Sequence, residues 1–409
     1  MSATAASRAP KQAVVLAGGR GTRLRPLTDT LPKPMIEFNG RPFLEYLVAL
    51  LREQGFEEVL LLLGYRPEAI QEHFGDGSGF GIKIGYSVTR PDAMTASRMM
   101  DARNRLDPTF LMLYCDNYWP LRMDRLWARY QEAGAPALVT VYRNTDAYSR
   151  DNVRLDGEGF VAAYDRSRTS PDLQGVEIGY AILQRSLVGE LPADNLQIEE
   201  ALYPGLARNH ELAAFVTDHR YYGIGSLERL PTTERFLMRQ PTVFLDRDGV
   251  LNRRPEIAGY IRRPDDVEWL PGALEAIRHL SEAGVRLIVV SNQAGVARGT
   301  MTSADLALVE GHMRDEISTA GGEIARFYYC THGWDEGCDC RKPRPGMLFQ
   351  AQRDFDLDLS RVPFVGDDER DGEAATAAGC PFFMVSEDCT LSDFADQFLH
   401  KGATRLMAR

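Results

Sequence analysis

The chain of 409 residues has no apolar run approaching the ~20 residues that a membrane-spanning helix needs. It also lacks an excess of positive charge. Its 47 lysines and arginines stand against 58 aspartates and glutamates, and the net charge of −11 argues against nucleic acids or acidic membranes as general partners. Only six cysteines are present, and residues 1–12 are small and basic without the apolar core of a signal peptide. We therefore expect a cytoplasmic protein whose clustered thiols bind a metal in preference to forming disulfides.

Two stretches of the chain have the pattern that begins an α/β domain. Residues 13–17 are an apolar strand followed by a glycine-rich loop, and residues 243–245 are another, followed by two aspartates. After each, apolar runs and helical periodicities alternate, as in Rossmann-like, doubly wound sheets. A short helix over residues 227–238 precedes Pro241, which discourages helix before the second strand. We predict a disordered lead-in at residues 1–12, a first domain at 13–239 with a mixed sheet, and a second domain at 240–409 with a parallel sheet.

The loop after the first strand, residues 18–24, reads Gly-Gly-Arg-Gly-Thr-Arg-Leu. Three glycines in four positions let the backbone bend tightly and bring N–H groups close to an anion, and two arginines supply positive charge. The loop therefore predicts a polyphosphate ligand. The candidate binding residues are Gly18, Gly19, Gly21 and Thr22.

This loop begins a longer run, residues 16–47, which continues through Leu-Pro-Lys-Pro-Met at 31–35 and Asn-Gly-Arg-Pro-Phe-Leu-Glu-Tyr at 39–46. The run resembles the start of the sugar-1-phosphate nucleotidyltransferases. The resemblance implies that a sugar 1-phosphate attacks the α-phosphorus of a nucleoside triphosphate with the help of Mg²⁺ and releases pyrophosphate. It further implies that Arg23 neutralises the leaving pyrophosphate and that Lys33 reaches the attacking phosphate or the α-phosphate.

The same resemblance assigns three residues beyond this run. It implies a metal ligand at Asp116, a sugar-hydroxyl acceptor at Glu177 and, in place of the family's usual lysine, a sugar-phosphate contact at Arg166. It also leaves room for a homo-oligomer formed through the first domain.

Two segments depart from that family's pattern. Residues 93–98 read Ala-Met-Thr-Ala-Ser-Arg where the family carries Leu-Gly-Thr-Ala/Gly-Gly-Ala, so its base-recognition loop cannot be transferred to this chain. Gly223 stands where a second metal aspartate is expected. Asp218, five positions earlier, has an odd offset that places it on the opposite strand face unless a bulge intervenes. We therefore expect metal binding in this domain to be weaker, or to be completed by the nucleotide phosphates.

The second domain opens with Val-Phe-Leu-Asp-Arg-Asp-Gly-Val-Leu-Asn at residues 243–252. Asp246 can attack phosphorus, while Asp248 protonates the leaving oxygen and later activates water. A carboxylate approaching a phosphate dianion at ~3.5 Å meets a repulsion of about 9 kcal/mol at an effective dielectric of 20, so the motif predicts Mg²⁺. The Asp-x-Asp-Gly motif after an apolar strand resembles the haloacid-dehalogenase (HAD) phosphatases. The full string resembles their histidinol-phosphate and heptose-bisphosphate phosphatase branch.

Later segments match further motifs of the HAD family. The resemblance implies that Ser291 and the neighbouring Asn292 donate hydrogen bonds to the phosphoryl group. It implies that Lys342 neutralises the nucleophile and the phosphate, and that Arg341 meets another phosphate of the substrate. No large insertion is present, so we predict a small lid and small sugar phosphates as substrates. The expected Mg²⁺ ligands are Asp246, Asp248 and Asp367, with Asp371 as a supporting acceptor.

Between these motifs lies a Cys-x-His-x5-Cys-x-Cys cluster formed by Cys330, His332, Cys338 and Cys340. Four soft or borderline ligands within eleven residues match a Cys₃His zinc site, and zinc sites of this kind occur in that phosphatase branch. Because four protein ligands leave no open position, we predict a structural Zn²⁺ that orders the loop and positions Arg341.

The two resemblances cover nearly the whole chain and imply a bifunctional enzyme. The second domain would remove the 7-phosphate of D-glycero-D-manno-heptose 1,7-bisphosphate through an aspartyl-phosphate. The first would then transfer a nucleoside monophosphate, GMP being favoured, to the heptose 1-phosphate. Two alternatives stay open. Either only the phosphatase is active and the first domain is a sugar-nucleotide sensor or assembly module, or both domains act on another sugar or polyol phosphate with CTP or ATP.

Overall fold

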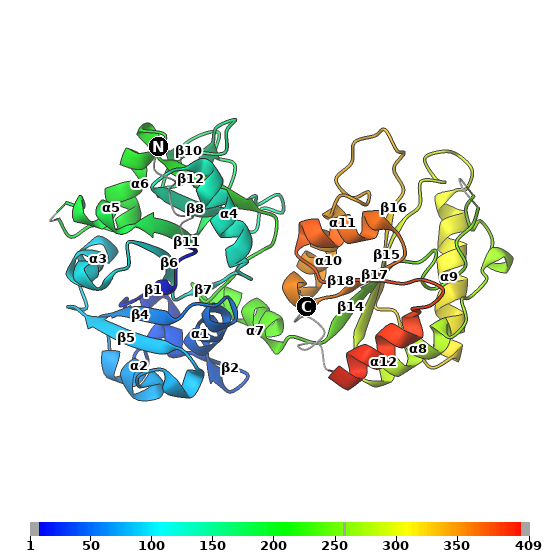
Figure 1. The fold of residues 1–409 in the computed structure, drawn as a ribbon, viewed down its shortest axis with the longest axis horizontal. Helices are drawn as coiled ribbons and strands as arrows, with labels where there is room; N and C mark the ends of the chain where they lie inside the picture. The colour runs from blue at the N-terminus through cyan, green and yellow to red at the C-terminus, as the bar shows by residue number, and fades with distance from the viewer. Residues whose placement is uncertain (1–7, 193, 257–258, 402–409) are drawn as a thin grey trace. The chain divides into compact units, whose positions relative to one another are not determined.

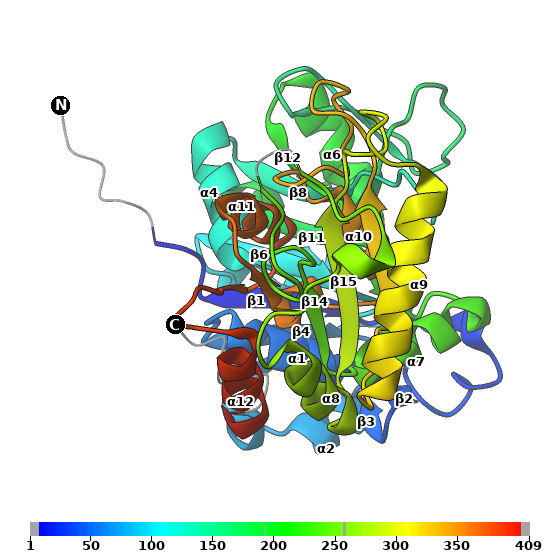
Figure 2. The ribbon, with the colours of Figure 1, turned by 90° about the vertical axis from the view of Figure 1, so that its right-hand side faces the viewer.

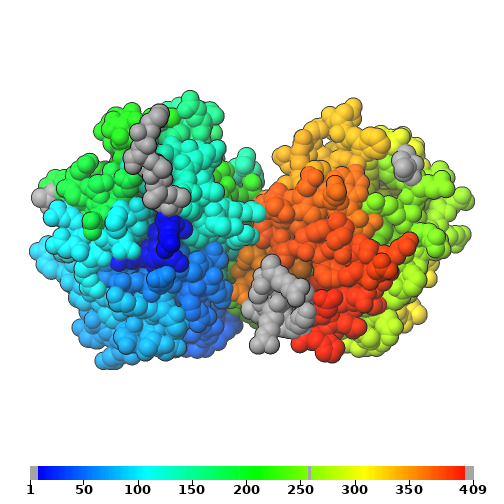
Figure 3. Space-filling view, in the orientation of Figure 1, coloured from blue at the N-terminus to red at the C-terminus, as the bar shows by residue number. Residues whose placement is uncertain are grey.

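The computed structural model describes residues 8–192, 194–256 and 259–401, and the chain forms two compact units, Met1–Leu237 and Met238–Arg409. Each unit is one continuous stretch of chain, as the colours of Figure 3 show. Of the lead-in predicted to be disordered, residues 1–7 lie outside the described residues. The first strand begins at Gln12, whose buried amide donates to Arg105 O at 2.9 Å and accepts from Asp107 N at 2.9 Å. Gln12 therefore belongs to the fold.

The first unit is built on a mixed sheet of seven strands in the order β12-β8-β11-β6-β1-β4-β5 (Figure 1). Its strands are β1 (Gln12–Ala17), β4 (Glu58–Leu63), β5 (Lys83–Val88), β6 (Thr109–Tyr114), β8 (Ala137–Tyr142), β11 (Val176–Gln184) and β12 (Leu212–Thr217). β11 runs antiparallel to β6 and β8, and the other neighbouring pairs are parallel. The mixed sheet predicted for this part of the chain is confirmed.

Helices cover both faces of this sheet. They are α1 (Phe43–Glu53), α2 (Pro67–Phe74), α3 (Thr95–Ala102), α4 (Met123–Ala133), α5 (Arg185–Gly189), α6 (Ile198–Arg208) and α7 (Leu230–Met238). In β1, Ala13, Val15 and Ala17 join one buried cluster, whereas Val14 and Leu16 join the other, because successive strand residues point to opposite sides. α1, α2, α4 and α7 contribute to the first cluster, and α3, α5 and α6 to the second.

Three short strand pairs lie outside the main sheet. They are β2 (Glu37–Phe38) with β3 (Arg41–Pro42), β7 (Asn117–Tyr118) with β13 (Tyr222–Gly223), and β9 (Val153–Leu155) with β10 (Val161–Tyr164). The 3-10 turns of this unit are η1 (Thr22–Leu24), η2 (Lys33–Met35), η3 (Ser78–Phe80), η4 (Arg103–Arg105) and η5 (Leu227–Arg229). The helix predicted over residues 227–238 opens as η5 and continues as α7.

The second unit contains a fully parallel sheet in the order β16-β15-β14-β17-β18 (Figure 2), as predicted. Its strands are β14 (Thr242–Leu245), β15 (Arg286–Asn292), β16 (Arg326–Cys330), β17 (Phe364–Gly366) and β18 (Phe382–Met384). Its helices and 3-10 turns are η6 (Pro264–Asp266), α8 (Ala273–Glu282), α9 (Ser303–Thr319), α10 (Gly346–Phe355), η7 (Leu359–Arg361), α11 (Glu369–Ala378) and α12 (Leu391–Lys401). Residues of α8, α9 and α12 form one buried cluster with the sheet, and residues of α10 and α11 form the other.

The last strand differs from its prediction. A strand and a helix are expected over residues 385–398, but β18 ends at Met384. Val385 N still donates to Gly366 O at 2.9 Å, so the first residue of the predicted segment continues the pairing with β17, and the predicted helix is present as α12. None of the helices that the structure describes is long and apolar enough to cross a membrane.

Candidate active sites and metal centres

The first candidate site lies at the carboxyl edge of the seven-stranded sheet. β1 and β6 are parallel neighbours, so the glycine-rich loop after β1 and Asp116 after β6 emerge at the same edge. β11 is antiparallel to β6, so Glu177, near its start, reaches this edge from the other direction. The topology thus brings together the predicted nucleotide loop, metal ligand and sugar contact.

Lys33 and Asp116 form an ion pair through Lys33 Nζ and Asp116 Oδ2. Lys33 opens η2 and is only 9% exposed. Gly21 has a φ of +62°, and a Cβ there would lie 2.9 Å from Lys33 Cβ, so this position requires glycine. Burial alone would raise the pKa of Asp116, yet Lys33 and Arg23 hold that pKa below its usual value. Asp116 is therefore ionised and can accept a cation.

The exposed side of the glycine-rich loop carries Gly19, Thr22 and Arg23, while Gly18 is buried beneath it. Arg23 has no hydrogen-bond or ion-pair partner among the residues that the structure describes. A Cβ built at Gly19 would meet no atom within 4 Å. An anion approaching the loop would therefore meet open space at Gly19 and a cation, Arg23, that has no hydrogen-bond or ion-pair partner in the described part of the chain.

Gly223 lies beside Asp116 and leaves the expected position of a second metal aspartate without a carboxylate. A Cβ at Gly223 would lie 2.7 Å from Asn117 Oδ1 and 3.3 Å from Asp116 O. Asp218 is paired with Arg143 at 2.9 Å after β12, and two strands separate β12 from β6. Within the described ranges, Asp116 belongs to no group of three or more side chains that could hold a metal ion. A cation at this edge would thus depend on Asp116 and on oxygens of the nucleotide.

Glu177 is 8% exposed, and its Oε1 accepts a hydrogen bond from Gly179 N at 2.7 Å. Burial raises the pKa of Glu177 to about 8, and the charge of Glu199 adds to the rise. At neutral pH this side chain therefore holds a proton, so it can donate as well as accept a hydrogen bond.

Arg166, predicted to meet the sugar phosphate, forms an ion pair with Glu200 at 2.8 Å. The positive charge of Arg168 opposes the rise in the pKa of Glu177. No sequence pattern distinguishes Arg168 from Arg166, because they lie two residues apart in the same loop after β10.

The second candidate site lies at the carboxyl edge of the parallel sheet. Asp246 follows β14, Ser291 lies near the end of β15, and Asp367 follows β17. β14 is hydrogen-bonded to both β15 and β17, so these three side chains reach the same edge.

Lys342 is the centre of this site. Its Nζ lies 2.9 Å from Asp246 Oδ1 and 2.7 Å from Asp371 Oδ1, and it donates to Val290 O at 3.0 Å. Lys342, Asp246 and Asp371 are all at most 6% exposed. Burial raises the pKa of Asp246 above its usual value. The negative charges of Asp371 and Asp248 add to this rise, and the positive charge of Lys342 opposes it. Lys342 therefore forms ion pairs with two buried carboxylates, those of Asp246 and Asp371.

The group that could hold a metal is Asp246, Asp367 and Asp371, whose ligand oxygens lie within 4.8 Å of one another. Three carboxylates suit a hard divalent cation such as Mg²⁺. Burial raises the pKa of Asp367 to about 6, and Arg254 opposes the rise from 2.9 Å. The side chain of Asp248, predicted as a ligand, lies outside this group, whereas Asp371, predicted as a supporting acceptor, lies within it.

Asp248 is instead held by three side chains. Arg247 donates to both of its carboxylate oxygens, from Nε at 3.1 Å and from Nη2 at 3.0 Å. Asn252 Nδ2 donates at 2.9 Å and Gln293 Nε2 at 2.7 Å. Arg247 is fully buried, which no sequence pattern indicated, although its place between the two aspartates brings it next to the carboxylate it orients. These three residues fix the direction of the expected acid–base group.

Ser291 is 1% exposed, and its Oγ accepts from Gln293 Nε2 at 3.1 Å. Asn292, predicted as a second donor to the phosphoryl group, turns elsewhere. Its Nδ2 donates to Lys342 O and its Oδ1 accepts from Lys342 N, both at 3.1 Å. Asn292 therefore clamps the backbone of the central lysine.

The four predicted zinc ligands come together in the structure. Cys330 Sγ lies 3.6 Å from Cys338 Sγ and 3.7 Å from His332 Nδ1, and His332 Nδ1 lies 3.2 Å from Cys340 Sγ. All four donor atoms lie within 4.8 Å of one another. A tetrahedral zinc with Zn–S bonds of about 2.3 Å needs sulfur atoms roughly 3.7 Å apart. The donor set and its spacing therefore fit zinc.

Arg341 directly follows this cluster. Its Nη1 is buried and has no hydrogen-bond partner among the described residues. The loop is further held by Arg344 Nη1, which donates to Cys338 O at 2.6 Å, and by Gly346 N, which donates to Asp339 O at 3.0 Å. A buried guanidinium nitrogen without a partner is what an arginine that awaits a phosphate would show.

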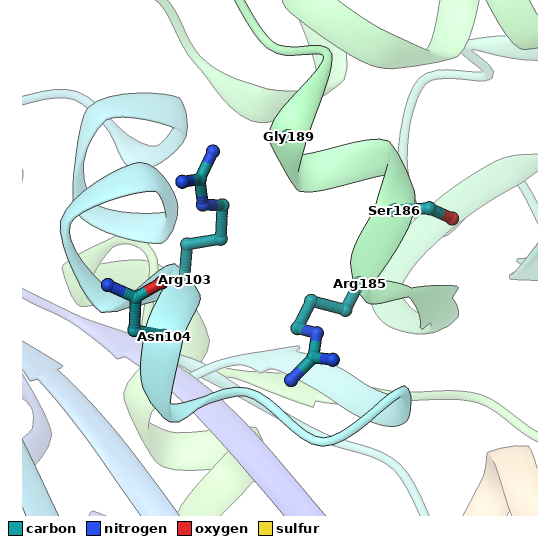
Figure 4. A pocket seen from close by; sticks show the side chains of 5 residues that line it. All are labelled: Arg103, Asn104, Arg185, Ser186 and Gly189. Atoms are coloured by element: carbon teal, nitrogen blue, oxygen red, sulfur yellow. The ribbon is translucent and has the colours of Figure 1, made fainter.

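A hollow of about 400 Å³ lies elsewhere on the first unit (Figure 4). It is lined by Arg103, Asn104, Arg185, Ser186 and Gly189. Arg103 belongs to η4 before β6, and Arg185 belongs to α5 after β11, so the hollow lies at the opposite edge of the sheet from Asp116. None of the predicted site residues lines it.

Known protein families match a segment in each half of the chain. The nucleotidyl transferase family model matches residues 12–153, and the HAD-hydrolase-like model matches residues 339–402. The D-glycero-beta-D-manno-heptose-1,7-bisphosphate 7-phosphatase of Pseudomonas aeruginosa is 43% identical over 148 residues, 36% of this chain and 82% of that protein. The D-glycero-alpha-D-manno-heptose-1,7-bisphosphate 7-phosphatase of Campylobacter jejuni is 35% identical over 162 residues, 39% of this chain and 91% of that protein. The crystal structure of HddC from Yersinia pseudotuberculosis is 20% identical, with a TM-score of 0.48, and covers 56% of this chain and 99% of its own.

A nucleotidyltransferase domain followed by a HAD phosphatase domain defines this protein as a bifunctional enzyme. Through its second unit the chain belongs to the heptose-bisphosphate phosphatase family, since it covers more than two thirds of relatives that are at least 35% identical.

The zinc cluster predicts that Cys338→Ala and Cys340→Ala will each lower both bound zinc and the stability of the second unit, because three ligands hold the metal less tightly than four. Metal content of the purified protein, from mass spectrometry, and urea unfolding measure the two effects. Cys389→Ala, outside the cluster, is the control and should keep its zinc. Unchanged zinc content in both cluster variants would refute the site.

The raised pKa of Glu177 predicts a pH-dependent stability. The folded protein keeps this proton up to a pH of about 8, whereas the unfolded chain releases it near 4.5, so stability falls as the pH rises between these values. Glu177→Gln cannot ionise and should gain stability relative to the wild type as the pH rises from about 5 to about 8. Urea unfolding at both pH values measures the difference, with the exposed Glu190→Gln as control. A difference that does not change with pH would show that Glu177 is ionised in the folded protein.

Proposed function

We propose that the chain catalyses two consecutive steps in the synthesis of a nucleotide-activated heptose. The second unit removes the 7-phosphate of D-glycero-D-manno-heptose 1,7-bisphosphate. The first transfers a nucleoside monophosphate to the resulting heptose 1-phosphate and releases pyrophosphate. The observation that carries the proposal is the buried Lys342, which joins Asp246 to Asp371. The names of the second unit's relatives support the choice of sugar.

The phosphatase half-reactions follow from the second site. An oxygen of Asp246 bonds to the 7-phosphorus while the bond from phosphorus to the sugar oxygen breaks, and Asp248 gives that oxygen its proton. A water then attacks the aspartyl-phosphate, Asp248 takes the proton of that water, and phosphate leaves. Lys342 and the hydroxyl of Ser291 stabilise the transferring phosphoryl group, and Arg341 binds the other phosphate. Asp246, Asp248 and Asp367 would hold Mg²⁺, whose charge would offset that of the phosphate, with Asp371 as a supporting acceptor beside Asp246 and Asp367.

The transferase step assigns roles at the first site. An oxygen of the sugar 1-phosphate bonds to the α-phosphorus, and the bond from that phosphorus to the bridging oxygen of pyrophosphate breaks. The loop with Gly18, Gly19, Gly21 and Thr22 binds the triphosphate, and Arg23 neutralises the pyrophosphate as it leaves. Lys33 contacts the attacking phosphate or the α-phosphate, and Asp116 would hold Mg²⁺ together with the nucleotide. The candidate sugar contacts are Glu177 and Arg166.

GTP is the triphosphate that we favour, in line with the GMP transfer favoured from the sequence, with CTP and ATP as alternatives. The second candidate function keeps only the phosphatase active and makes the first unit a sugar-nucleotide sensor or assembly module. The absence of a carboxylate at Gly223 favours it, whereas the ionised Asp116 beside Lys33 and Arg23 favours transfer.

We propose residues 13–239 and 240–409 as the transferase and phosphatase domains, with a structural zinc in the latter. Both reactions are assigned to the cytoplasm, where the thiols of the zinc cluster stay reduced. Any homo-oligomer is expected to form through the first domain.

Asp246→Asn is expected to abolish phosphate release while leaving nucleotidyl transfer from ready-made heptose 1-phosphate unchanged, because the amide cannot attack phosphorus. The reciprocal variant, Lys33→Met, should lose transfer and keep phosphate release. Separate assays of phosphate and of pyrophosphate, with GTP, CTP and ATP in turn, measure both. Loss of both activities in Asp246→Asn would contradict two separate sites.

A further inference from the structure

Arg98 is a buried cation that neither candidate mechanism uses. It lies on α3, in the segment that replaces the family's base-recognition run, and is 3% exposed. Its Nη1 donates to Leu63 O at 2.6 Å and to Thr89 Oγ1, and its Nη2 donates to Gly18 O at 3.1 Å and to Arg90 O at 3.2 Å. Among the described residues it forms no ion pair. The guanidinium is thus surrounded by neutral acceptors.

The side chain of Arg98 leaves no room for a Cβ at two positions, which are both glycine. A Cβ at Gly18 would lie 2.2 Å from Arg98 Cζ, and a Cβ at Gly64 would lie 2.3 Å from Arg98 Nη1. Any other residue at either position would displace the guanidinium. The Arg98 side chain therefore packs directly against the backbone of the glycine-rich loop and of the turn after β4.

The hydrogen bond to Gly18 O has a consequence for the next residue. Gly18 O accepts from Arg98 Nη2 at 3.1 Å and also from Tyr65 N at 3.1 Å, so it is held from the inside of the fold. In a planar trans peptide the N–H points opposite to the C=O, so the N–H of Gly19 must point away from Arg98. Gly19 is exposed, and a Cβ built on it would meet no atom within 4 Å.

We propose that Arg98 is a positioning residue for the nucleotide, which aims the Gly18–Gly19 peptide at the triphosphate and adds a buried positive charge behind it. The inference rests on the proposed transferase function. Burial lowers the pKa of Arg98, and the carboxylates of Asp92 and Asp101 oppose that change without pairing with it. The triphosphate would bring negative charge to the far side of the Gly18–Gly19 peptide, where the guanidinium itself is bonded only to neutral acceptors. A lysine cannot replace Arg98, since one ammonium cannot reach acceptors on several separate turns.

The test compares Arg98→Lys with the wild type in steady-state transfer, using the triphosphate that the wild type turns over fastest. The KM for that triphosphate should rise about tenfold or more, because charge-assisted hydrogen bonds are lost. The KM for the sugar 1-phosphate and the rate of phosphate release from the second unit should stay unchanged. Arg103→Lys is the matched control, since Arg103 is exposed and has no ion pair in the described ranges.

A second pair of variants covers the case in which Arg98→Lys fails to fold. Thr89→Val removes one acceptor of Arg98 and should also raise the triphosphate KM, and Thr89→Ser should restore it. Unchanged triphosphate KM, or an equal rise for both substrates, would overturn the inference and leave the transferase function standing. If the wild type itself binds and turns over no triphosphate, the transferase function fails, and the role of Arg98 fails with it.

Discussion

Each site depends on a lysine that is buried against a carboxylate at the carboxyl edge of a sheet. Lys33 pairs with Asp116 in the first unit, and Lys342 pairs with Asp246 and Asp371 in the second. Two buried ions are stable only as a pair, and removing one partner costs roughly 3–5 kcal/mol. The charges that we propose to bind phosphate are therefore also needed to keep these edges folded, so both lysines have a structural role besides their proposed chemical one.

The balance of charge differs between the two sites, and it matches what each must bind. Lys342 pairs with Asp246 and Asp371 beside Asp367, so one cation stands against three carboxylates and negative charge remains for a divalent cation to offset. Asp116 stands against Lys33 and Arg23, which lower its pKa. The first site therefore has an excess of positive charge, which suits a triphosphate. Among the described residues, the carboxylate group that could hold a metal lies at the second site, and this difference fits the two kinds of phosphate chemistry that we propose.

Much of the fold and part of the site could be predicted from the sequence, because local signals decide them. Apolar runs ending in a glycine-rich loop or in aspartates mark strands that deliver side chains to a shared edge, and the structure brings Lys33 to Asp116 and Asp246 to Lys342. The zinc cluster could be predicted because its spacing along the chain already contains all four ligands.

Side-chain directions could not be predicted, since packing between distant segments decides them. The carboxylate of Asp371 lies with those of Asp246 and Asp367, whereas the carboxylate of Asp248 accepts hydrogen bonds from Arg247 and Gln293. Arginine is rarely fully buried, so nothing in the sequence indicated that Arg247 or Arg98 would be. Both are explained only by acceptors that the fold places around them.

The most direct test of the two-step account is a phosphorus NMR time course on the intact enzyme. The sample holds D-glycero-D-manno-heptose 1,7-bisphosphate, Mg²⁺ and one nucleoside triphosphate, with GTP, CTP and ATP in separate runs. The account predicts that phosphate appears first, and that pyrophosphate and a nucleotide-heptose then appear in equal amounts with one triphosphate. Phosphate release without pyrophosphate under every triphosphate would contradict it.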